Sequence, residues 1–177
     1  MTEAAREPGR PLHLVCMGVS GTGKSSVGEE LWTRLGWAFA EGDDFHPRAN
    51  IAKMEAGQPL TDEDRWPWLE ELAAWTAQHD ALGEPTILTC SALRRSYRDL
   101  LRGGGEGTWF VHLVGDHELL MERMDHREGH FMPASLLQSQ LDTLEPLEED
   151  EQGGVFDVAE PPDVIADQVL DRLGLEA

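Results

Sequence analysis

Short apolar runs recur along the chain, separated by longer stretches in which apolar residues follow a helical spacing. The clearest runs cover residues 12–17, 86–90 and 109–114, and weaker ones cover residues 37–40 and 155–158. Runs of this length without polar alternation predict strands that are buried on both faces. We therefore expect five strands in one parallel sheet.

Apolar residues three or four positions apart fill the intervals between these strands and predict helices. Pro67 leaves the start of the longest helix open, because that helix either begins near Trp66 or kinks there. The expected helices cover residues 24–35, 47–56, 61–81, 94–102, 116–124 and 133–144, and a last one carries Ile165, Val169, Leu170 and Leu173. Strands that alternate with helices predict an α/β fold whose sheet is covered by helices on both faces.

The length and composition are those of one globular domain. The 177 residues correspond to a single domain over 1–177, with residues 1–10 as a flexible polar tail. Cys16 and Cys90 lie inside apolar runs, which is typical of buried thiols in a reducing compartment. No apolar leader opens the chain, and no run approaches the ~20 apolar residues of a membrane helix. We therefore expect a cytoplasmic protein.

The charge is strongly acidic, with 34 Asp and Glu against 14 Lys and Arg and a formal net charge of -20. This balance argues against nucleic acid or an anionic membrane as a partner, since both need a basic face. Residues 128–177 alone hold 13 acidic residues and one basic residue. We interpret this region, and mainly the stretch 145–151, as a solvated outer surface. Arg98 and Arg102 are likewise expected on a solvated helix face.

The stretch after the first strand carries a motif with a definite chemistry. Residues 18–25 match G-x-x-x-x-G-K-[ST], in which glycines let successive backbone N–H groups point at phosphate oxygens. Lys24 is expected to reach the β- and γ-phosphates of ATP, and the Ser25 hydroxyl is expected to ligate Mg²⁺. The expected nucleotide-binding residues are Gly18, Ser20, Gly21, Thr22, Gly23, Lys24, Ser25 and Ser26.

A phosphate loop by itself leaves the reaction open. The N-K-x-D motif of GTPases is absent from the sequence, which argues against that class. The third apolar run continues into Cys90 and Ser91 rather than into the acidic pair of an ATPase motor. A kinase that acts on small molecules or nucleotides remains, and we expect Ser91 to lie beside the phosphate loop.

Four segments, 17–28, 41–69, 90–102 and 127–151, carry a further signal, and 41–69 and 127–151 are the long and more specific ones. Over these segments the chain resembles the gluconate kinases of the shikimate-kinase-like P-loop group. The resemblance implies phosphoryl transfer from ATP to D-gluconate, which gives 6-phospho-D-gluconate. It also implies the strand order 2-3-1-4-5, a mobile lid at about 123–133 and a possible homodimer.

Candidate residues for the sugar acid follow the second strand. Asp43 stands at the carboxyl end of that strand, where ligands of open α/β sheets bind. Its carboxylate can accept the proton of a substrate hydroxyl or orient that hydroxyl. Glu41 is expected to reach Mg²⁺ through water. His46 is expected either to hydrogen-bond substrate hydroxyls or to be an ordinary turn residue.

Basic residues are candidates for the gluconate carboxylate, and arginine is favoured because it binds carboxylates through two nitrogens. We expect Arg48 or Lys53 to make this contact, and we expect Arg94, at the end of the third strand, to contact the substrate. The alternative for Arg48 and Lys53 is a surface ion pair with Glu55 or Asp62.

Two arginines flank the expected lid. Together with Lys24 and Asp43, Arg123 and Arg127 are the candidate catalytic residues. An arginine stabilises the charge that develops on the transferred phosphoryl group. His130 is a further candidate for substrate contact.

Two other functions stay open at this point. The first is another kinase of the group that acts on shikimate or a nucleoside monophosphate, although a nucleotide acceptor needs more basic residues for its phosphate. The second is a nucleotide-binding domain that keeps the phosphate loop without turnover.

Overall fold

The computed structural model describes residues 10–125 and 136–175, and in these parts of the chain the strands form one sheet. The strands are β1 (His13–Met17), β2 (Ala38–Glu41), β3 (Thr86–Thr89), β4 (Thr108–Val114) and β5 (Gly153–Asp157). Their order is β2-β3-β1-β4-β5 and every neighbouring pair is parallel. The expected parallel sheet and its strand order are confirmed.

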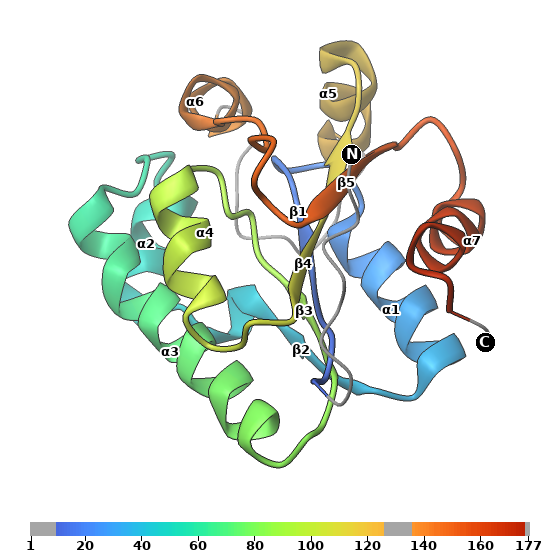
Figure 1. The fold of residues 1–177 in the computed structure, drawn as a ribbon. Coiled ribbons are helices and arrows are strands. Elements are labelled where there is room, and N and C mark those ends of the chain that lie inside the picture. Colours follow the sequence, from blue (N-terminus) through green and yellow to red (C-terminus); the bar gives the residue numbers. More distant parts are fainter. Residues whose placement is uncertain (1–9, 126–135, 176–177) are drawn as a thin grey trace.

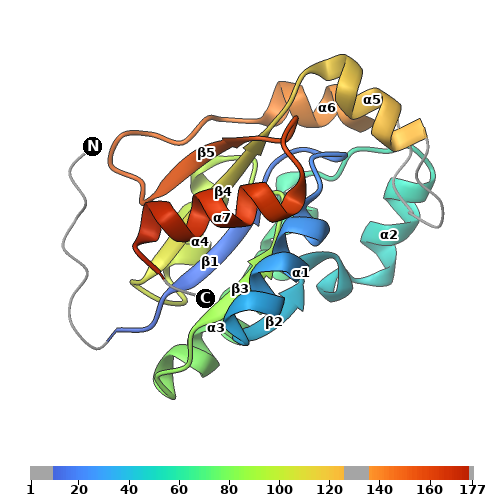
Figure 2. The same ribbon diagram turned by 90° about the vertical axis from the view of Figure 1, so that its right-hand side faces the viewer.

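Helices cover both faces of this sheet, as predicted. The helices are α1 (Lys24–Leu35), α2 (Arg48–Glu55), α3 (Asp62–Ala81), α4 (Arg95–Arg102), α5 (His117–Asp125), α6 (Leu136–Thr143) and α7 (Pro162–Leu173), with a short 3-10 helix η1 (Gly42–Phe45). Helices α1 and α7 lie against one face, and α3 and α4 lie against the other (Figure 1). Helices α5 and α6 stand beyond the carboxyl ends of the strands, where Figure 2 also places them.

The core lies between the sheet and these helices. All five residues of β1 are buried, and β3 is buried over its whole length. Cys16 and Cys90 are buried free thiols, as their apolar surroundings predict, and burial raises the pKa of each to about 12. None of the helices in the described parts of the chain has the length and apolarity needed to cross a membrane.

Helix α3 begins at Asp62, one residue from the expected bound at residue 61, so of the two alternatives that Pro67 left open the start near Trp66 is wrong. Thr61 caps the helix: its hydroxyl accepts a hydrogen bond from Asp64 N, and the Asp64 carboxylate accepts one from Thr61 N. This reciprocal capping box satisfies two backbone donors of the first turn. Because the cap fixes the start at Asp62, the proline falls inside the helix rather than at its first position.

Arg98 contradicts the expectation of a solvated helix face, since its side chain is fully buried. Its Nε and Nη2 atoms donate to the two carboxylate oxygens of Glu151 at 2.7 and 3.0 Å, and Nη1 donates to Ala92 O at 2.9 Å. Arg102, which is half-buried, donates to the same carboxylate at 2.9 Å. The spacing of four along α4 could not reveal this partner, because Glu151 lies 53 residues further along the chain.

The acidic stretch 145–151 is therefore more than a solvated surface. Besides Glu151, its residues Glu148 and Asp150 both pair with Arg95 of α4, and Glu145 accepts a hydrogen bond from Arg95 N. Negative charges of this stretch meet the positive charges of α4, and the segment that leads into β5 is attached to that helix.

Candidate active site at the carboxyl edge of the sheet

The phosphate loop joins the end of β1 to the start of α1 and has the predicted compact form. Gly18 has a φ of +145°, and a Cβ atom there would lie 2.7 Å from Leu113 O, so the position accepts only glycine. Gly18 N donates to Ser91 O at 3.2 Å. Ser91 therefore lies beside the loop, as predicted from the sequence.

Lys24, the first residue of α1, folds back over the loop. Its Nζ atom donates to Gly18 O at 3.0 Å and to Val19 O at 3.1 Å, and the Thr22 hydroxyl donates to Val19 O at 2.9 Å. These bonds hold an ammonium group beside the amides at the N-terminus of a helix, which is an arrangement suited to anions.

Of the eight predicted nucleotide-binding residues, Gly18, Thr22 and Ser26 are not in the pocket lining. Thr22 is buried beneath the phosphate loop and Ser26 is exposed on α1. The members that line the pocket are Ser20, Gly21, Gly23, Lys24 and Ser25.

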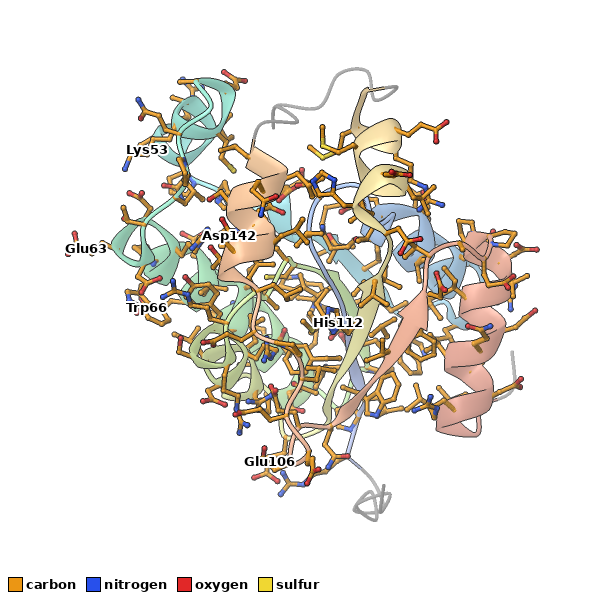
Figure 3. All side chains as sticks on the ribbon, turned by 90° about the horizontal axis from the view of Figure 1, so that it is seen from above. Lys53, Glu63, Trp66, Glu106, His112 and Asp142 are labelled. Carbon is orange, nitrogen blue, oxygen red and sulfur yellow. The ribbon has the colours of Figure 1, made fainter. Side chains whose placement is uncertain are left out.

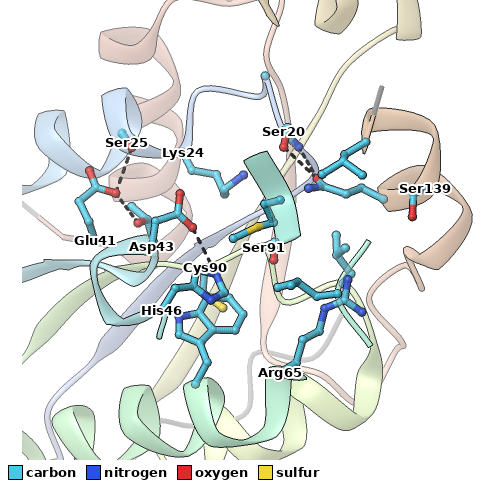
Figure 4. Close-up of a pocket in the computed structure, with 18 of the residues that line it drawn as sticks. Ser20, Lys24, Ser25, Glu41, Asp43, His46, Arg65, Cys90, Ser91 and Ser139 are labelled. Atoms are coloured by element: carbon cyan, nitrogen blue, oxygen red, sulfur yellow. Dashed lines mark hydrogen bonds and ion pairs between the residues drawn. The ribbon is translucent and has the colours of Figure 1, made fainter. Parts of the chain in front are cut away.

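Gln140 of α6 also contacts the phosphate loop, although no sequence pattern indicated this contact. Its Oε1 atom accepts hydrogen bonds from Ser20 N at 2.7 Å and from the Ser20 hydroxyl at 3.1 Å (Figure 4). The two residues are 120 positions apart, and no spacing pattern connects them. Helix α6 thus forms one wall of the pocket through Leu136, Ser139 and Gln140.

A cluster of oxygen atoms lies next to the loop where β2 ends. Glu41 Oε2 accepts hydrogen bonds from the Ser25 hydroxyl at 3.0 Å and from the Thr89 hydroxyl at 2.5 Å. Gly42 lets β2 approach β3 here, because a Cβ atom at this position would lie 2.1 Å from Thr89 O. Glu41, which the sequence analysis expects to reach Mg²⁺ through water, thus lies beside Ser25, the expected Mg²⁺ ligand.

Asp43 and His46 follow on the same turn and face each other. His46 Nε2 lies 3.8 Å from Asp43 Oδ1, and both side chains line the pocket (Figure 4). The imidazole stacks on the Trp68 ring, with ring centres 3.9 Å apart and planes 16° apart. Trp68 Nε1 donates to Gly42 O at 2.7 Å, so the indole supports the whole turn.

Burial sets the protonation state of His46. Removal from water lowers the pKa of its imidazole to about 4, although the nearby Asp43 carboxylate acts in the opposite direction. The positive charge of Arg65 lowers the pKa a little further. His46 is therefore neutral at pH 7.

Arg65 of α3 is a second pocket residue that was not predicted from the sequence. It lines the pocket opposite the phosphate loop, and its Nη1 atom donates to the Tyr97 hydroxyl at 2.8 Å. The guanidinium carbon lies 5.3 Å from the centre of the Tyr97 ring, and the Tyr97 hydroxyl donates to the Asp62 carboxylate. The only sequence signal for Arg65 in the site was its position one residue before Trp66, inside the segment 41–69 that carries part of the family resemblance.

Three basic residues predicted to contact substrate lie away from the pocket lining. Arg48 is exposed at the start of α2, and Arg94 Nη1 lies 3.3 Å from Asp62 Oδ2. Lys53 Nζ donates to Asp64 Oδ2 at 2.7 Å, so its partner is neither Glu55 nor Asp62. Figure 3 shows Lys53 on the outer side of α2.

The residues predicted around a lid are only partly described. Arg123 lies near the end of α5 and donates from Nη2 to Val158 O at 2.7 Å, outside the pocket lining. Arg127, His130 and most of the segment 123–133 lie outside the described residues.

A phosphate loop at the carboxyl edge of a β2-β3-β1-β4-β5 sheet, with a carboxylate, a neutral histidine and an arginine in one pocket, defines a P-loop kinase of small molecules. Residues 13–147 match the AAA_33 family, described as an AAA domain.

Similar proteins show which family of kinases the chain belongs to. The chain is 50% identical over 171 residues to a gluconokinase of Gluconobacter oxydans, covering 96% of both chains. Two solved structures are similar. A sugar kinase from Janibacter sp. HTCC2649 is 52% identical with a TM-score of 0.89, covering 93% of this chain and 95% of that one. A gluconokinase from Sinorhizobium meliloti 1021 is 50% identical with a TM-score of 0.80, covering 93% and 92%. The chain belongs to the gluconokinase family.

Proposed function

We propose that this protein transfers the γ-phosphoryl group of ATP to a hydroxyl of D-gluconate and so forms 6-phospho-D-gluconate. The observation that carries this proposal is the single pocket in which the phosphate loop, Asp43, His46 and Arg65 converge. That pocket offers positive charge for phosphates, a base for a hydroxyl and a cation for a carboxylate. The names of the relatives supply the sugar acid, because they are gluconokinases.

The phosphate chain of ATP fits the loop and the start of α1. Backbone amides, the helix N-terminus and the Lys24 ammonium together favour negatively charged oxygens. Lys24 is already held over the loop by its bonds to Gly18 O and Val19 O. As charge shifts onto the leaving ADP, these groups stabilise it without moving far.

Mg²⁺ fits the oxygen cluster formed by Ser25 and Glu41. A hydroxyl and one carboxylate are hard oxygen ligands, and Mg²⁺ in kinases takes one or two such groups together with water and phosphate oxygens. Within the described ranges no three His, Cys, Asp or Glu side chains gather around one point, which suits a metal that relies mainly on the nucleotide. When bound, Mg²⁺ supplies positive charge that neutralises the phosphate oxygens.

Asp43 is the residue that we assign to the acceptor hydroxyl. Its carboxylate accepts the hydroxyl proton while the hydroxyl oxygen bonds to the γ-phosphorus and the bond from that phosphorus to the ADP oxygen breaks. His46 binds a substrate hydroxyl from the side. Arg123 and Arg127 are proposed to stabilise the charge on the transferred group, and His130 to contact the sugar acid.

Arg65 is our first candidate for the gluconate carboxylate. It reaches the pocket, and the Tyr97 hydroxyl and ring hold its guanidinium in a fixed direction. Arg48, Lys53 and Arg94 are the alternatives carried over from the sequence. Arg65→Lys keeps the charge but loses the two-nitrogen geometry, so KM for gluconate should rise about tenfold while KM for ATP stays unchanged.

An assay of ADP release tests the proposed reaction directly. Gluconate, shikimate and CMP are offered side by side at equal concentration with Mg²⁺ and ATP, and we expect turnover with gluconate only. Turnover with shikimate or CMP that equals or exceeds turnover with gluconate would contradict the proposal. Binding of ATP without turnover on any acid would favour an inactive nucleotide-binding domain.

The setting of the protein in the cell is also a proposal. We infer a cytoplasmic enzyme without a nucleic-acid or membrane partner, because its net charge is -20 and both cysteines are buried free thiols. We also propose a homodimer, which the resemblance to gluconate kinases suggests. Sedimentation equilibrium of the full chain tests the dimer.

A further inference from the structure

The inner ring nitrogen of His46 faces a buried amide on α2. Asn50 is 3% exposed, and its Nδ2 atom lies 3.3 Å from His46 Nδ1. The same Nδ2 atom donates to the backbone oxygen of Asp64 at 3.0 Å. One amide nitrogen therefore stands between an imidazole nitrogen and a carbonyl oxygen.

The carbonyl of Asp64 decides which way this amide points. A backbone oxygen accepts hydrogen bonds and cannot donate, so the NH₂ group of Asn50 must face it rather than the amide oxygen. The second N–H of that group is then directed at His46 Nδ1. A nitrogen that receives an N–H must offer its lone pair, so the proton of a neutral imidazole at His46 resides on Nε2.

We propose that Asn50 is a positioning residue that holds His46 as the Nε2–H tautomer, so that His46 donates a hydrogen bond to the acceptor substrate beside Asp43. This inference rests on the proposed function for the substrate, but not for the tautomer. The charged groups that face His46 are Asp43 on η1 and Arg65 on α3.

The space between the two pocket side chains agrees with this role. The 3.8 Å between His46 Nε2 and Asp43 Oδ1 is too long for a direct hydrogen bond. A hydroxyl oxygen at about 2.8 Å from each atom fits between them, accepting from His46 and donating to Asp43. A hydroxyl bound this way has its proton aimed at the carboxylate and a second lone pair left for the phosphorus.

The assignment separates the roles of two groups that could each have been the base. A histidine that donates through Nε2 has its only lone pair occupied by Asn50, so it cannot take the substrate proton. Burial keeps the imidazole neutral at pH 7, which agrees with this picture. Asp43 is left as the proton acceptor, and His46 fixes the direction of the hydroxyl.

Nitrogen NMR of the imidazole rings measures the tautomer without any substrate. In ¹⁵N-labelled wild-type protein at pH 7, the His46 ring, identified by its loss in His46→Gln, should show a protonated Nε2 and an unprotonated Nδ1. A proton on Nδ1, or averaging between the two tautomers, would overturn the proposal. This measurement needs only the wild-type fold and does not depend on the identity of the sugar acid.

Asn50→Asp then tests the consequence for catalysis. Its carboxylate accepts a hydrogen bond from His46 instead of donating one, so the single ring proton should move from Nε2 to Nδ1, and KM for gluconate should rise about tenfold with KM for ATP unchanged. Gln58→Glu, which adds the same charge at an exposed position just beyond α2, is the matched control and should alter neither value. An unprotonated Nδ1 in Asn50→Asp, or an unchanged KM for gluconate once Nε2 has lost its proton, would refute the positioning role. Absence of gluconate turnover in the wild type would instead refute the proposed function.

Discussion

Two histidine–aspartate pairs stand at opposite ends of the same sheet. At the start of β1, His13 Nε2 donates to Asp80 Oδ1 at 2.8 Å, and the Thr86 hydroxyl lies 2.8 Å from Nδ1. Beyond the end of β2, His46 Nδ1 faces Asn50, but Nε2 stops 3.8 Å short of Asp43. Both imidazoles are buried, so burial alone does not distinguish them.

The two pairs differ in whether both ring nitrogens of the histidine are bonded within the protein. Both nitrogens of His13 are bonded within the protein, where they join β1, β3 and the end of α3. His46 keeps a donor directed into a pocket that also holds the phosphate loop. A closed pair stabilises the fold and an open pair can bind a ligand, although the same two residue types form both.

The largest effect should come from breaking the open pair at its carboxylate. Asp43→Asn keeps the size of the side chain but cannot accept the substrate proton, so kcat should fall by about 10²–10⁴. ATP affinity should remain near that of the wild type, because the phosphate loop is untouched. Steady-state kinetics and ATP titration measure the two quantities, and near-normal kcat would remove Asp43 from the mechanism.

Breaking the closed pair should have the opposite outcome. His13→Leu leaves the buried Thr86 hydroxyl without a side-chain partner, and the free energy of unfolding should fall by about 3 kcal/mol while kcat is unchanged. Urea unfolding and the kinase assay are run on the same preparation. A large loss of kcat with unchanged stability would contradict a purely stabilising role for His13.

A third buried histidine extends the comparison to the pH dependence of stability. His112 on β4 lies inside the molecule, and neither of its ring nitrogens has a hydrogen-bond partner within the described parts of the chain (Figure 3). Burial, helped by the charge of Arg98, lowers its pKa to about 4, and burial also lowers that of His46 to about 4.

Both histidines take up a proton more readily in the unfolded chain, whose imidazoles titrate near 6.5. Stability is therefore complete above pH 6.5 and is lost as the pH falls toward 4. At pH 5 each histidine should cost about 2 kcal/mol of unfolding free energy. Urea unfolding at pH 8 and pH 5 should show His112→Leu losing less stability than the wild type. An equal loss in both proteins would exclude His112 as a source.

The smallest effect should come from the exposed partner of the closed pair. Asp80 retains 37% side-chain exposure, so water replaces much of what its carboxylate gives to His13. Asp80→Asn should lower the free energy of unfolding by about 1 kcal/mol or less and leave kcat unchanged. Differential scanning calorimetry resolves a shift of this size, and a loss as large as that of His13→Leu would contradict it.

The fold could be predicted because its signals are local. Buried strands are short apolar runs, and the glycines and Lys24 of the phosphate loop sit at fixed spacing between a strand and a helix. The expected ends of most elements differ from the observed ones by one or two residues, as for residues 86–90 and β3. The start of α3 also agrees with the expected range 61–81, and the Thr61 capping box decides against the alternative start near Trp66 that Pro67 had left open.

The site could be predicted only as far as single segments reveal it. Asp43 and His46 follow the end of a strand, and that position alone places them beside the phosphate loop. Arg65 and Gln140 enter the pocket from helices whose packing no spacing rule specifies. The prediction of a solvated position for Arg98 was wrong for the same reason. A pattern of arginines along one helix cannot show a buried carboxylate that comes from another part of the chain.

The buried contact of Glu151 with Arg98 also fixes the alignment of the edge strand. β5 begins with Gly153 and Gly154, which have no side chains to distinguish one pairing with β4 from another. A slip of two residues would keep the same faces inward but move the chain by about 6.6 Å along β4. Glu151 would then leave its arginine, and two charges would be stranded in the interior. A single carboxylate just outside the strand thus selects the register in which β5 pairs with β4 at the edge of the sheet.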